Sequence, residues 1–215
     1  MKINGAIFDL DGTLLDSMHI WEEIGRDYLK LKGIIPDMSI KHELKVMSLY
    51  NAACYMKEKY CISDSTDKIM SDINKMTEDF YINDVLPKEG AVDFLKALQE
   101  KGVRMCLATA TDRYLAEAAL KRNGMLDFFG RIFTCTEVGH GKDQPFIFRS
   151  ALAYLDTDIS SVWVFEDASH AAHTAKKEGF NVCAIFDKSE SDSKTLEKNS
   201  DIYIQSFKEA SEYFD

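Results

Sequence analysis

Short apolar segments recur along the chain and alternate with longer amphipathic ones. Most of the short segments are apolar at nearly every position rather than at every second one, which is typical of strands buried on both faces. The first of them ends abruptly at Asp11-Gly12-Thr13, a turn sequence. The strands expected on this basis cover residues 3–10, 104–108, 132–135, 162–165, 182–186 and 202–204.

Between these segments, apolar residues follow the spacing of amphipathic helices. Residues 91–101, 113–123 and 171–178 are each followed by a glycine, a common signal of a helix C-terminus, and a fourth helix is expected over 146–154. The alternation of strand and helix predicts an α/β fold, a Rossmann-like core in which helices cover a parallel sheet.

One long segment breaks this alternation. Residues 16–83 contain helical patterns at 20–31, 40–59 and 67–81, with no convincing strand between them. We therefore expect an all-helical insertion at 16–83 and a core formed by residues 1–15 together with 84–215.

Composition and charge limit the classes of protein to which the chain can belong. The chain has 215 residues, of which 46% are hydrophobic, enough for one substantial core or for one core plus a small second domain. Lys and Arg number 26 against 36 Asp and Glu, a net charge of −10 that disfavours nucleic acid and anionic membranes as partners. The five cysteines are scattered, and no apolar run approaches a membrane span. We expect a cytoplasmic protein with reduced thiols.

The candidate chemistry begins at Asp9 and Asp11, directly after the first strand. Two positions apart in extended backbone, these carboxylates lie on the same face, at the strand end where open α/β sheets form their binding sites. An isolated Asp-x-Asp is most often a solvated turn. Here, however, Gly12 permits close approach of the backbone to a ligand, so we take the pair as a candidate catalytic site.

The chain resembles the haloacid dehalogenase-like superfamily in four motifs that occur in that family's order. They are Phe-Asp-Leu-Asp-Gly-Thr at 8–13, Met-Cys-Leu-Ala-Thr at 105–109, Gly-Lys-Asp-Gln-Pro at 141–145 and Val-Trp-Val-Phe-Glu-Asp at 162–167. The helical insertion and the motif set most resemble the beta-phosphoglucomutase and phosphoglycolate phosphatase branch, in which such an insertion forms a cap over the site.

The resemblance implies a role for each motif. Asp9 is the nucleophile and Asp11 the acid/base partner, and Thr109 and Lys142 complete the catalytic set. A threonine hydroxyl can donate to a phosphoryl oxygen and a lysine ammonium can offset its charge, so Thr109 and Lys142, with Ala110, are expected to bind the substrate.

The same resemblance implies Mg²⁺ as cofactor, a cation that prefers carboxylates, waters and substrate phosphate. Its expected ligands are a carboxylate oxygen of Asp9, the backbone carbonyl of Asp11 and the carboxylate of Asp167. Glu166 belongs to the same candidate metal site, either directly or through a metal-bound water.

Substrate selection is expected in the cap. His19 is the leading candidate for contact with the substrate because it lies close to the entry hinge, and Trp21, Lys45 and Ser48 are further candidates. A closing cap would exclude water and present side chains to the leaving group.

The sequence therefore predicts a Mg²⁺-dependent phosphatase acting on a small phosphorylated metabolite, a sugar phosphate among the candidates, as a monomer or weak dimer. The alternative is a sugar phosphomutase of the beta-phosphoglucomutase type, although Leu49 stands after Ser48 where such mutases carry an arginine. A dehalogenase is disfavoured by the presence of Asp11, and a receiver module by the length of the chain. Departures from the family pattern border the site at Asp143, Phe146, Ala168 and Ala171.

Overall fold

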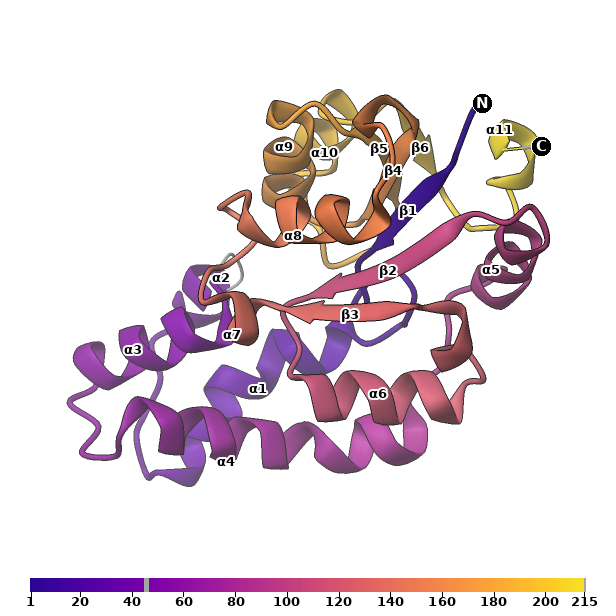
Figure 1. Ribbon diagram of the computed structural model, residues 1–215. Coiled ribbons are helices and arrows are strands. Elements are labelled where there is room, and N and C mark those ends of the chain that lie inside the picture. The colour runs from indigo at the N-terminus through magenta and orange to yellow at the C-terminus, as the bar shows by residue number, and fades with distance from the viewer. Residues whose placement is uncertain (45–46, 215) are drawn as a thin grey trace.

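A parallel sheet of six strands forms the centre of the core in the computed structural model, which describes residues 1–44 and 47–214 and, for Glu22, the backbone alone. The strand order is β3-β2-β1-β4-β5-β6, and every pair is parallel. The strands are β1 Gly5–Phe8, β2 Arg104–Thr109, β3 Arg131–Thr134, β4 Val162–Glu166, β5 Asn181–Ile185 and β6 Ile202–Ile204. The arrowheads of β1, β2 and β3 point toward the helices of residues 18–84 (Figure 1).

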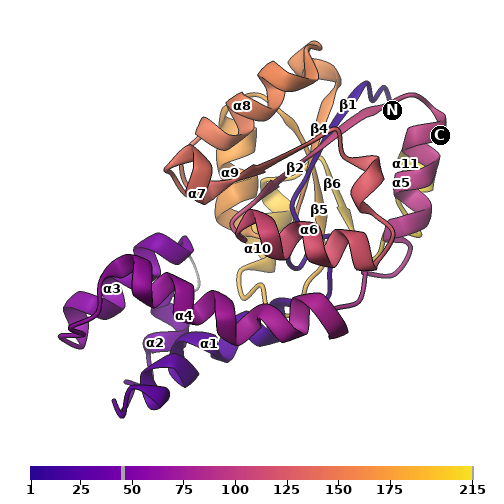
Figure 2. The same ribbon diagram turned by 60° about the horizontal axis from the view of Figure 1, so that its bottom comes forward.

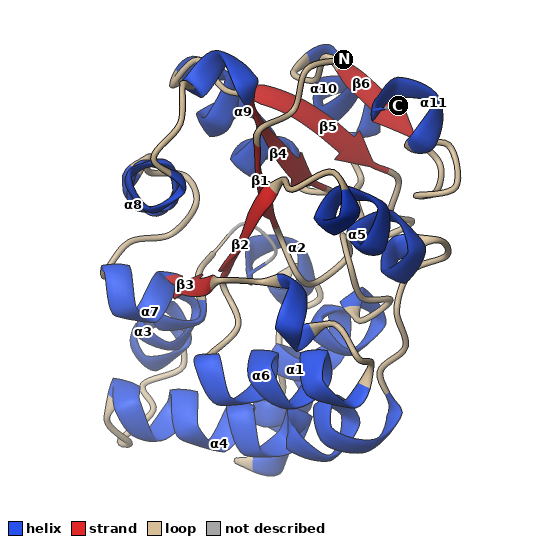
Figure 3. Cartoon of the chain, turned by 45° about the vertical axis from the view of Figure 1, so that its right-hand side comes forward, coloured by secondary structure: helices blue, strands red, loops and turns tan. Residues whose placement is uncertain are grey.

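The sheet is buried on both faces, as its near-continuous apolar strands predicted. Neighbouring residues of one strand enter different cores: Phe8 packs against Phe94 of α5, whereas Ile7 belongs to the apolar cluster that also contains Phe148 of α8. Figure 3 shows α5 and α8 on opposite sides of the strands. The core helices are α5 Ala91–Glu100, α6 Arg113–Arg122, α7 Cys135–Val138, α8 Phe146–Leu155, α9 Ser169–Lys177, α10 Ser193–Lys198 and α11 Ser211–Phe214, and short 3₁₀ turns form η2 Leu126–Phe128 and η3 Ile159–Ser161.

The inserted segment is helical throughout its described elements and forms a separate lobe with its own apolar core (Figure 2). We call this lobe the cap. Its helices are α1 Met18–Leu31, α2 Ile40–Leu44, α3 Leu49–Lys59 and α4 Thr66–Asp79, and α4 continues into a π-helical turn, η1 Phe80–Asp84. The α/β core with an all-helical cap is thus as expected.

Most elements begin and end within one or two residues of the expected bounds, and two larger differences concern the first strand and the helix expected over 40–59. The first strand is shorter than residues 3–10, because only Gly5–Phe8 pair with the neighbouring strands. The helix expected over 40–59 is two helices, and Ser48 begins the second by accepting a hydrogen bond from the backbone N–H of Asn51. No described helix is long and apolar enough to cross a membrane.

Candidate active site

The first, second and fourth motifs converge because their strands are neighbours in register. Phe8 pairs with Leu107 on one side and with Phe165 on the other, so the residues that follow these three strands meet at one edge of the sheet. The order of the strands also reverses at this point, since β2 and β3 lie on one side of β1 and β4, β5 and β6 lie on the other. Open α/β sheets form their binding sites at such switch points.

Asp9 lies at this edge as a buried carboxylate, 7% exposed. The ammonium group of Lys142 donates hydrogen bonds to Asp9 and, over 2.6 Å, to Glu166. Burial raises the pKa of Asp9 to about 6, although the nearby Lys142 charge acts to lower it. Burial acts to lower the pKa of Lys142, but Asp9 and Glu166 outweigh it and raise that pKa, so the ammonium stays charged.

Glu166 uses both of its carboxylate oxygens. One accepts the hydrogen bond from Lys142, and the other accepts from the backbone N–H groups of Asp167 at 3.0 Å and Ala168 at 3.1 Å. The side chain is almost fully buried. Glu166 therefore fixes both the position of Lys142 and the turn that follows β4.

Asp167 completes a cluster of three buried carboxylates. Oxygen atoms of Asp9, Glu166 and Asp167 lie within 4.8 Å of one another. The hydroxyl of Thr13 donates to Asp167 over 2.9 Å, yet burial, followed by the charges of Glu166 and Asp9, raises the pKa of Asp167 well above its ordinary value. Three carboxylates facing the single charge of Lys142 suit a hard divalent cation.

Gly12 brings the first loop against this cluster. Its φ of +81° lies in the left-handed region, and a Cβ atom at this position would overlap a carboxylate oxygen of Asp167. Glycine is thus required both by the backbone conformation and by the close approach.

Asp11 accepts hydrogen bonds from three hydroxyl groups. They belong to Ser17 at 2.6 Å, Thr111 at 2.5 Å and Tyr81, which in turn accepts a hydrogen bond from the indole N–H of Trp21 at 2.6 Å. Burial, followed by the charge of Asp9, raises the pKa of Asp11. The carboxyl group is therefore held in one orientation and biased toward its protonated form.

Tyr81 and Thr111 were missed from the sequence. Thr111 lies two residues beyond Thr109 in the same motif, so the Thr-x-Thr spacing was an available signal. Tyr81 had no local signal, because it reaches Asp11 only through the turn that returns the cap to the core.

Three other residues expected to contact the substrate differ in where they lie relative to the cavity. Ala110 lines the cavity beside Asp9 and Asp11. Thr109 is fully buried, and its hydroxyl oxygen accepts a hydrogen bond from the backbone N–H of Thr111 at 3.0 Å. His19 is exposed, packs its ring edge-on against Phe80 and does not line the cavity. Its position therefore does not support the expected substrate contact.

The other candidates in the cap also differ in whether they line the cavity. Trp21 and Ser48 line the cavity, as does Leu49, whereas Lys45 lies outside the described residues. Among the positions that depart from the family pattern, Asp143 and Ala168 line the cavity as well.

The cavity has a volume of about 480 Å³ and lies between the cap and the sheet edge. A side chain at Gly141 would lie 3.6 Å from the Cβ atom of Ser48, so cap and core approach closely here. On another side, the side-chain amide of Asn74 donates to Asp112, which also accepts from Thr136 over 2.7 Å.

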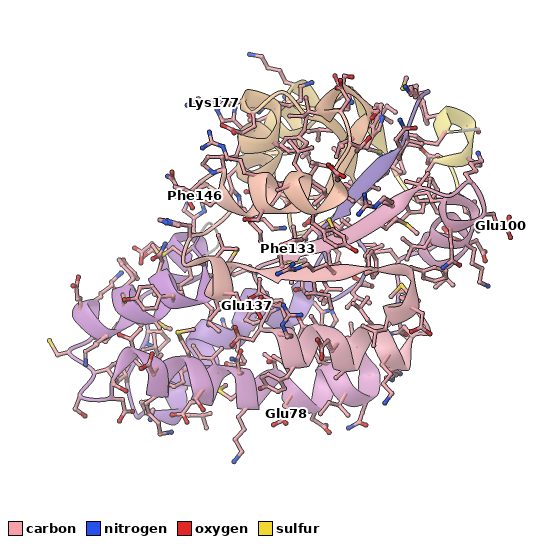
Figure 4. The ribbon with its side chains drawn as sticks, in the orientation of Figure 1. Glu78, Glu100, Phe133, Glu137, Phe146 and Lys177 are labelled. Carbon is pink, nitrogen blue, oxygen red and sulfur yellow. The ribbon has the colours of Figure 1, made fainter. Side chains whose placement is uncertain are left out.

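Thr136 belongs to α7, the short helix that follows β3 and also carries Glu137. Figure 4 shows Glu137 beyond the end of β3, on the side of the cap, with Phe133 farther back along the strand. Arg113 binds Glu137 over 2.5 Å, which ties α6 to α7 at the place where Asn74 of the cap reaches the core. The cap and the core thus approach each other at two places, at Ser48 with Gly141 and at Asn74 with Asp112.

Comparison with known proteins identifies the class. The family model described as haloacid dehalogenase-like hydrolase matches residues 6–185. The chain belongs to this family and is a hydrolase.

Curated relatives carry phosphatase names. Validoxylamine A 7'-phosphate phosphatase of Streptomyces hygroscopicus subsp. limoneus is 27% identical over 174 residues, which cover 81% of each chain. The mitochondrial (DL)-glycerol-3-phosphatase 1 of Arabidopsis thaliana is 30% identical over 197 residues, covering 86% of this chain and 65% of that protein. Among solved structures, CbbY from Rhodobacter sphaeroides in complex with phosphate has a TM-score of 0.84 at 19% identity over 95% of both chains, and so shares the fold.

Proposed function

We propose that this hydrolase is a Mg²⁺-dependent phosphomonoesterase that acts on a small phosphate ester through an aspartyl-phosphate on Asp9. The observation that carries the proposal is the pairing of two buried carboxylates with different surroundings. Asp9 contacts the cation Lys142, as a nucleophile requires, whereas Asp11 is surrounded by hydroxyl groups and has a raised pKa, as an acid requires.

The donor set at the sheet edge fits a magnesium ion. Asp9 and Asp167 are the carboxylates that would hold it, with the backbone carbonyl of Asp11. Both oxygens of Glu166 already accept hydrogen bonds from Lys142 and two backbone N–H groups, which favours a role for Glu166 in positioning Lys142. When bound, Mg²⁺ supplies positive charge that offsets the charge of the phosphate and of Asp9.

In the first step a carboxylate oxygen of Asp9 attacks phosphorus, and the bond from phosphorus to the ester oxygen breaks. Asp11 gives its proton to the departing alkoxide, while Lys142 compensates negative charge beside Asp9. In the second step Asp11, now ionised, takes a proton from water as that water attacks the aspartyl-phosphate. Phosphate leaves, and Asp9 is restored as a carboxylate.

The position of Leu49 favours hydrolysis over the mutase alternative. A phosphomutase must hold the second phosphate of a bisphosphate intermediate, a task that suits an arginine. Leu49 instead presents an aliphatic side chain to the cavity. Water is then the acceptor of the phosphoryl group rather than a second sugar hydroxyl.

Phosphate release tests the proposal. Sugar phosphates, phosphoglycolate, nucleoside monophosphates and cofactor phosphates are assayed with Mg²⁺ and with EDTA. We expect metal-dependent release from at least one class, complete loss of release in Asp9→Asn and a loss of about 10²-fold to 10⁴-fold in Asp11→Asn. Asp93→Asn makes the same change at a side chain that is 89% exposed, and should retain full activity. Full activity of Asp9→Asn would refute the mechanism.

The covalent intermediate has a separate test. An added alcohol competes with water for the aspartyl-phosphate, so the ratio of phosphorylated alcohol to free phosphate should be the same for substrates with different leaving groups. Ratios that change with the leaving group would indicate direct attack by water.

The remaining predictions from the sequence concern the setting of the enzyme. A small phosphate ester as the partner molecule follows from the proposed activity. A cytoplasmic location, a monomer or weak dimer, and the lack of nucleic-acid or membrane partners stay predictions.

A further inference from the structure

The cavity has a charged end and an apolar end. At the sheet edge its walls include Asp9, Asp11 and Lys142. Opposite them, the cap contributes what we call the apolar wall, which is drawn from all four cap helices: Trp21 and Ile24 of α1, Leu44 of α2, Leu49 and Met56 of α3, and Ile73 of α4. If the phosphoryl group is bound at the charged end, the rest of the substrate faces this wall.

The polar side chains that the described part of the cap contributes to the cavity have hydrogen-bond partners or lie at the surface. The indole N–H of Trp21 donates to Tyr81, and the hydroxyl oxygen of Ser48 accepts from the backbone N–H of Asn51. Among the described lining residues, the basic side chains of the cap are Arg26, Lys41 and His42, and all three are exposed. They border the cavity at its solvent side rather than in its interior.

Gly25 shows that the wall depends on close packing. It lies within α1, where glycine is unfavourable for a helix, and it also lines the cavity. A Cβ atom at Gly25 would overlap the end of the Leu44 side chain. The glycine therefore allows Leu44 of α2 to pack directly on α1, which closes the apolar wall between the two helices.

We infer, on the basis of the proposed phosphatase activity, that the preferred substrate is a phosphomonoester of an apolar alcohol, with a hydrocarbon chain or ring as its leaving group. Binding a polyol here would remove water from its hydroxyl groups, and the apolar wall offers few hydrogen-bond partners in return, so the transfer costs free energy. Moving a hydrocarbon group from water to the same wall is favourable. The volume of about 480 Å³ lies within the usual range for small-molecule sites and leaves room for a ring or a medium-length chain.

A homologous series of substrates tests this inference on the unaltered enzyme. Phosphate release with Mg²⁺ is measured for propyl, butyl, pentyl and hexyl phosphate, whose leaving alcohols have nearly the same acidity. We expect kcat/KM to rise roughly fourfold with each methylene, the factor that corresponds to burying one such group. Cyclohexylmethyl phosphate should exceed glucose 6-phosphate by at least about tenfold, although the sugar is the better leaving group.

The outcomes separate this inference from the proposed function. Release from all esters with no rise along the series, or with glucose 6-phosphate preferred, would overturn the apolar substrate class and leave the phosphatase standing. No release from the alkyl esters, with release from another class of phosphate ester, would likewise overturn only the apolar substrate class. No release with Mg²⁺ from these esters or from any class assayed above would overturn the phosphatase and this inference together.

Two matched variants test whether the preference for longer alkyl chains depends on the apolar wall. Ile24→Thr puts a hydroxyl group on the apolar wall, and Ile20→Thr makes the same change on the same helix at a partly buried residue that does not line the cavity. Ile24→Thr should reduce the ratio of kcat/KM for hexyl over propyl phosphate about fivefold or more, whereas Ile20→Thr should keep the ratio. An unchanged ratio in folded Ile24→Thr would contradict the inference, and the series on the unaltered enzyme stands independently of how either variant folds.

Discussion

The hydroxyl group of Tyr81 donates a hydrogen bond to the carboxylate of Asp11, although 70 positions separate the two residues. Tyr81 is fully buried in the π-helical turn through which the cap returns to the core, and it also accepts the indole N–H of Trp21 from the other end of the cap. Asp11 is thereby held by both ends of the insertion. The orientation of the proposed acid/base group depends on the cap being seated on the core.

The first prediction removes this hydrogen bond. In Tyr81→Phe, Asp11 loses a donor that favours its ionised form, so its pKa should rise further. The proposed acid would then keep its proton to higher pH, and the alkaline decline of kcat/KM should move upward. We also expect kcat to fall about tenfold, since the carboxyl group is less well oriented.

Tyr28→Phe provides the control, because Tyr28 is equally buried but lies in the apolar core of the cap. Its pH profile should match that of the unaltered enzyme. If Tyr81→Phe also left the profile of kcat/KM unchanged, Tyr81 would have only a packing role.

The convergence of three of the four motifs could be predicted from the sequence because its information is local. The first, second and fourth motifs lie at the ends of strands whose apolar pattern identifies them, and the parallel pairing of β1 with β2 and β4 brings these strand ends together. Tyr81 could not be found in this way, since its contact with Asp11 is set by the packing of the cap on the core rather than by any nearby pattern.

The expectation for His19 shows the same limit on a single helix. Met18, Trp21 and Gly25 line the cavity and follow the three- and four-residue spacing of one helix face. His19 is one position beyond Met18, which turns its side chain about 100° around the helix. Its place near the hinge was clear from the sequence, but its direction depended on where the helix begins.

The second prediction concerns stability without metal. Burial and neighbouring carboxylates raise the pKa of Asp167 well above its ordinary value in the folded protein. The folded state therefore binds more protons than the unfolded state above about pH 4, so this group makes the protein less stable as the pH rises. In EDTA, the free energy of unfolding of the unaltered protein minus that of Asp167→Asn should fall between pH 4 and pH 7.

Magnesium should reverse this trend, because a bound cation compensates the ionised carboxylates. The thermal midpoint of the unaltered protein at pH 7 should rise on addition of Mg²⁺, and that of Asp167→Asn should rise much less. A difference between the two proteins that is constant with pH in EDTA would show that Asp167 is not destabilising when ionised.

The third prediction separates Glu166 from ordinary surface acids. In Glu166→Gln, one amide oxygen must replace two carboxylate oxygens, and the NH₂ group must face either Lys142 or two backbone N–H donors. We expect a loss of about 2–4 kcal/mol in the free energy of unfolding, together with a large loss of kcat as Lys142 shifts.

Glu137→Gln is the matched control for this variant. Glu137 also pairs with a cation, Arg113, but its side chain is 45% exposed. Urea denaturation should show a loss below about 1 kcal/mol for Glu137→Gln. Equal losses in the two variants would mean that the buried network adds nothing beyond a surface ion pair.

The last prediction uses two glycines with similar backbone conformations. Gly12 has a φ of +81° and Gly102 a φ of +73°, so alanine strains the backbone at either position, by about 1–2 kcal/mol. A Cβ atom at Gly12 would also overlap the carboxylate of Asp167, whereas a Cβ atom at Gly102 would meet nothing within 4 Å. Gly12→Ala should therefore displace a proposed metal ligand, and Gly102→Ala should not. Titration of phosphate release with Mg²⁺ should show an activation constant that is raised about tenfold or more in Gly12→Ala and unchanged in Gly102→Ala. A tenfold change corresponds to a loss of about 1.4 kcal/mol in the free energy of Mg²⁺ binding. Equal activation constants would place the metal away from Asp167.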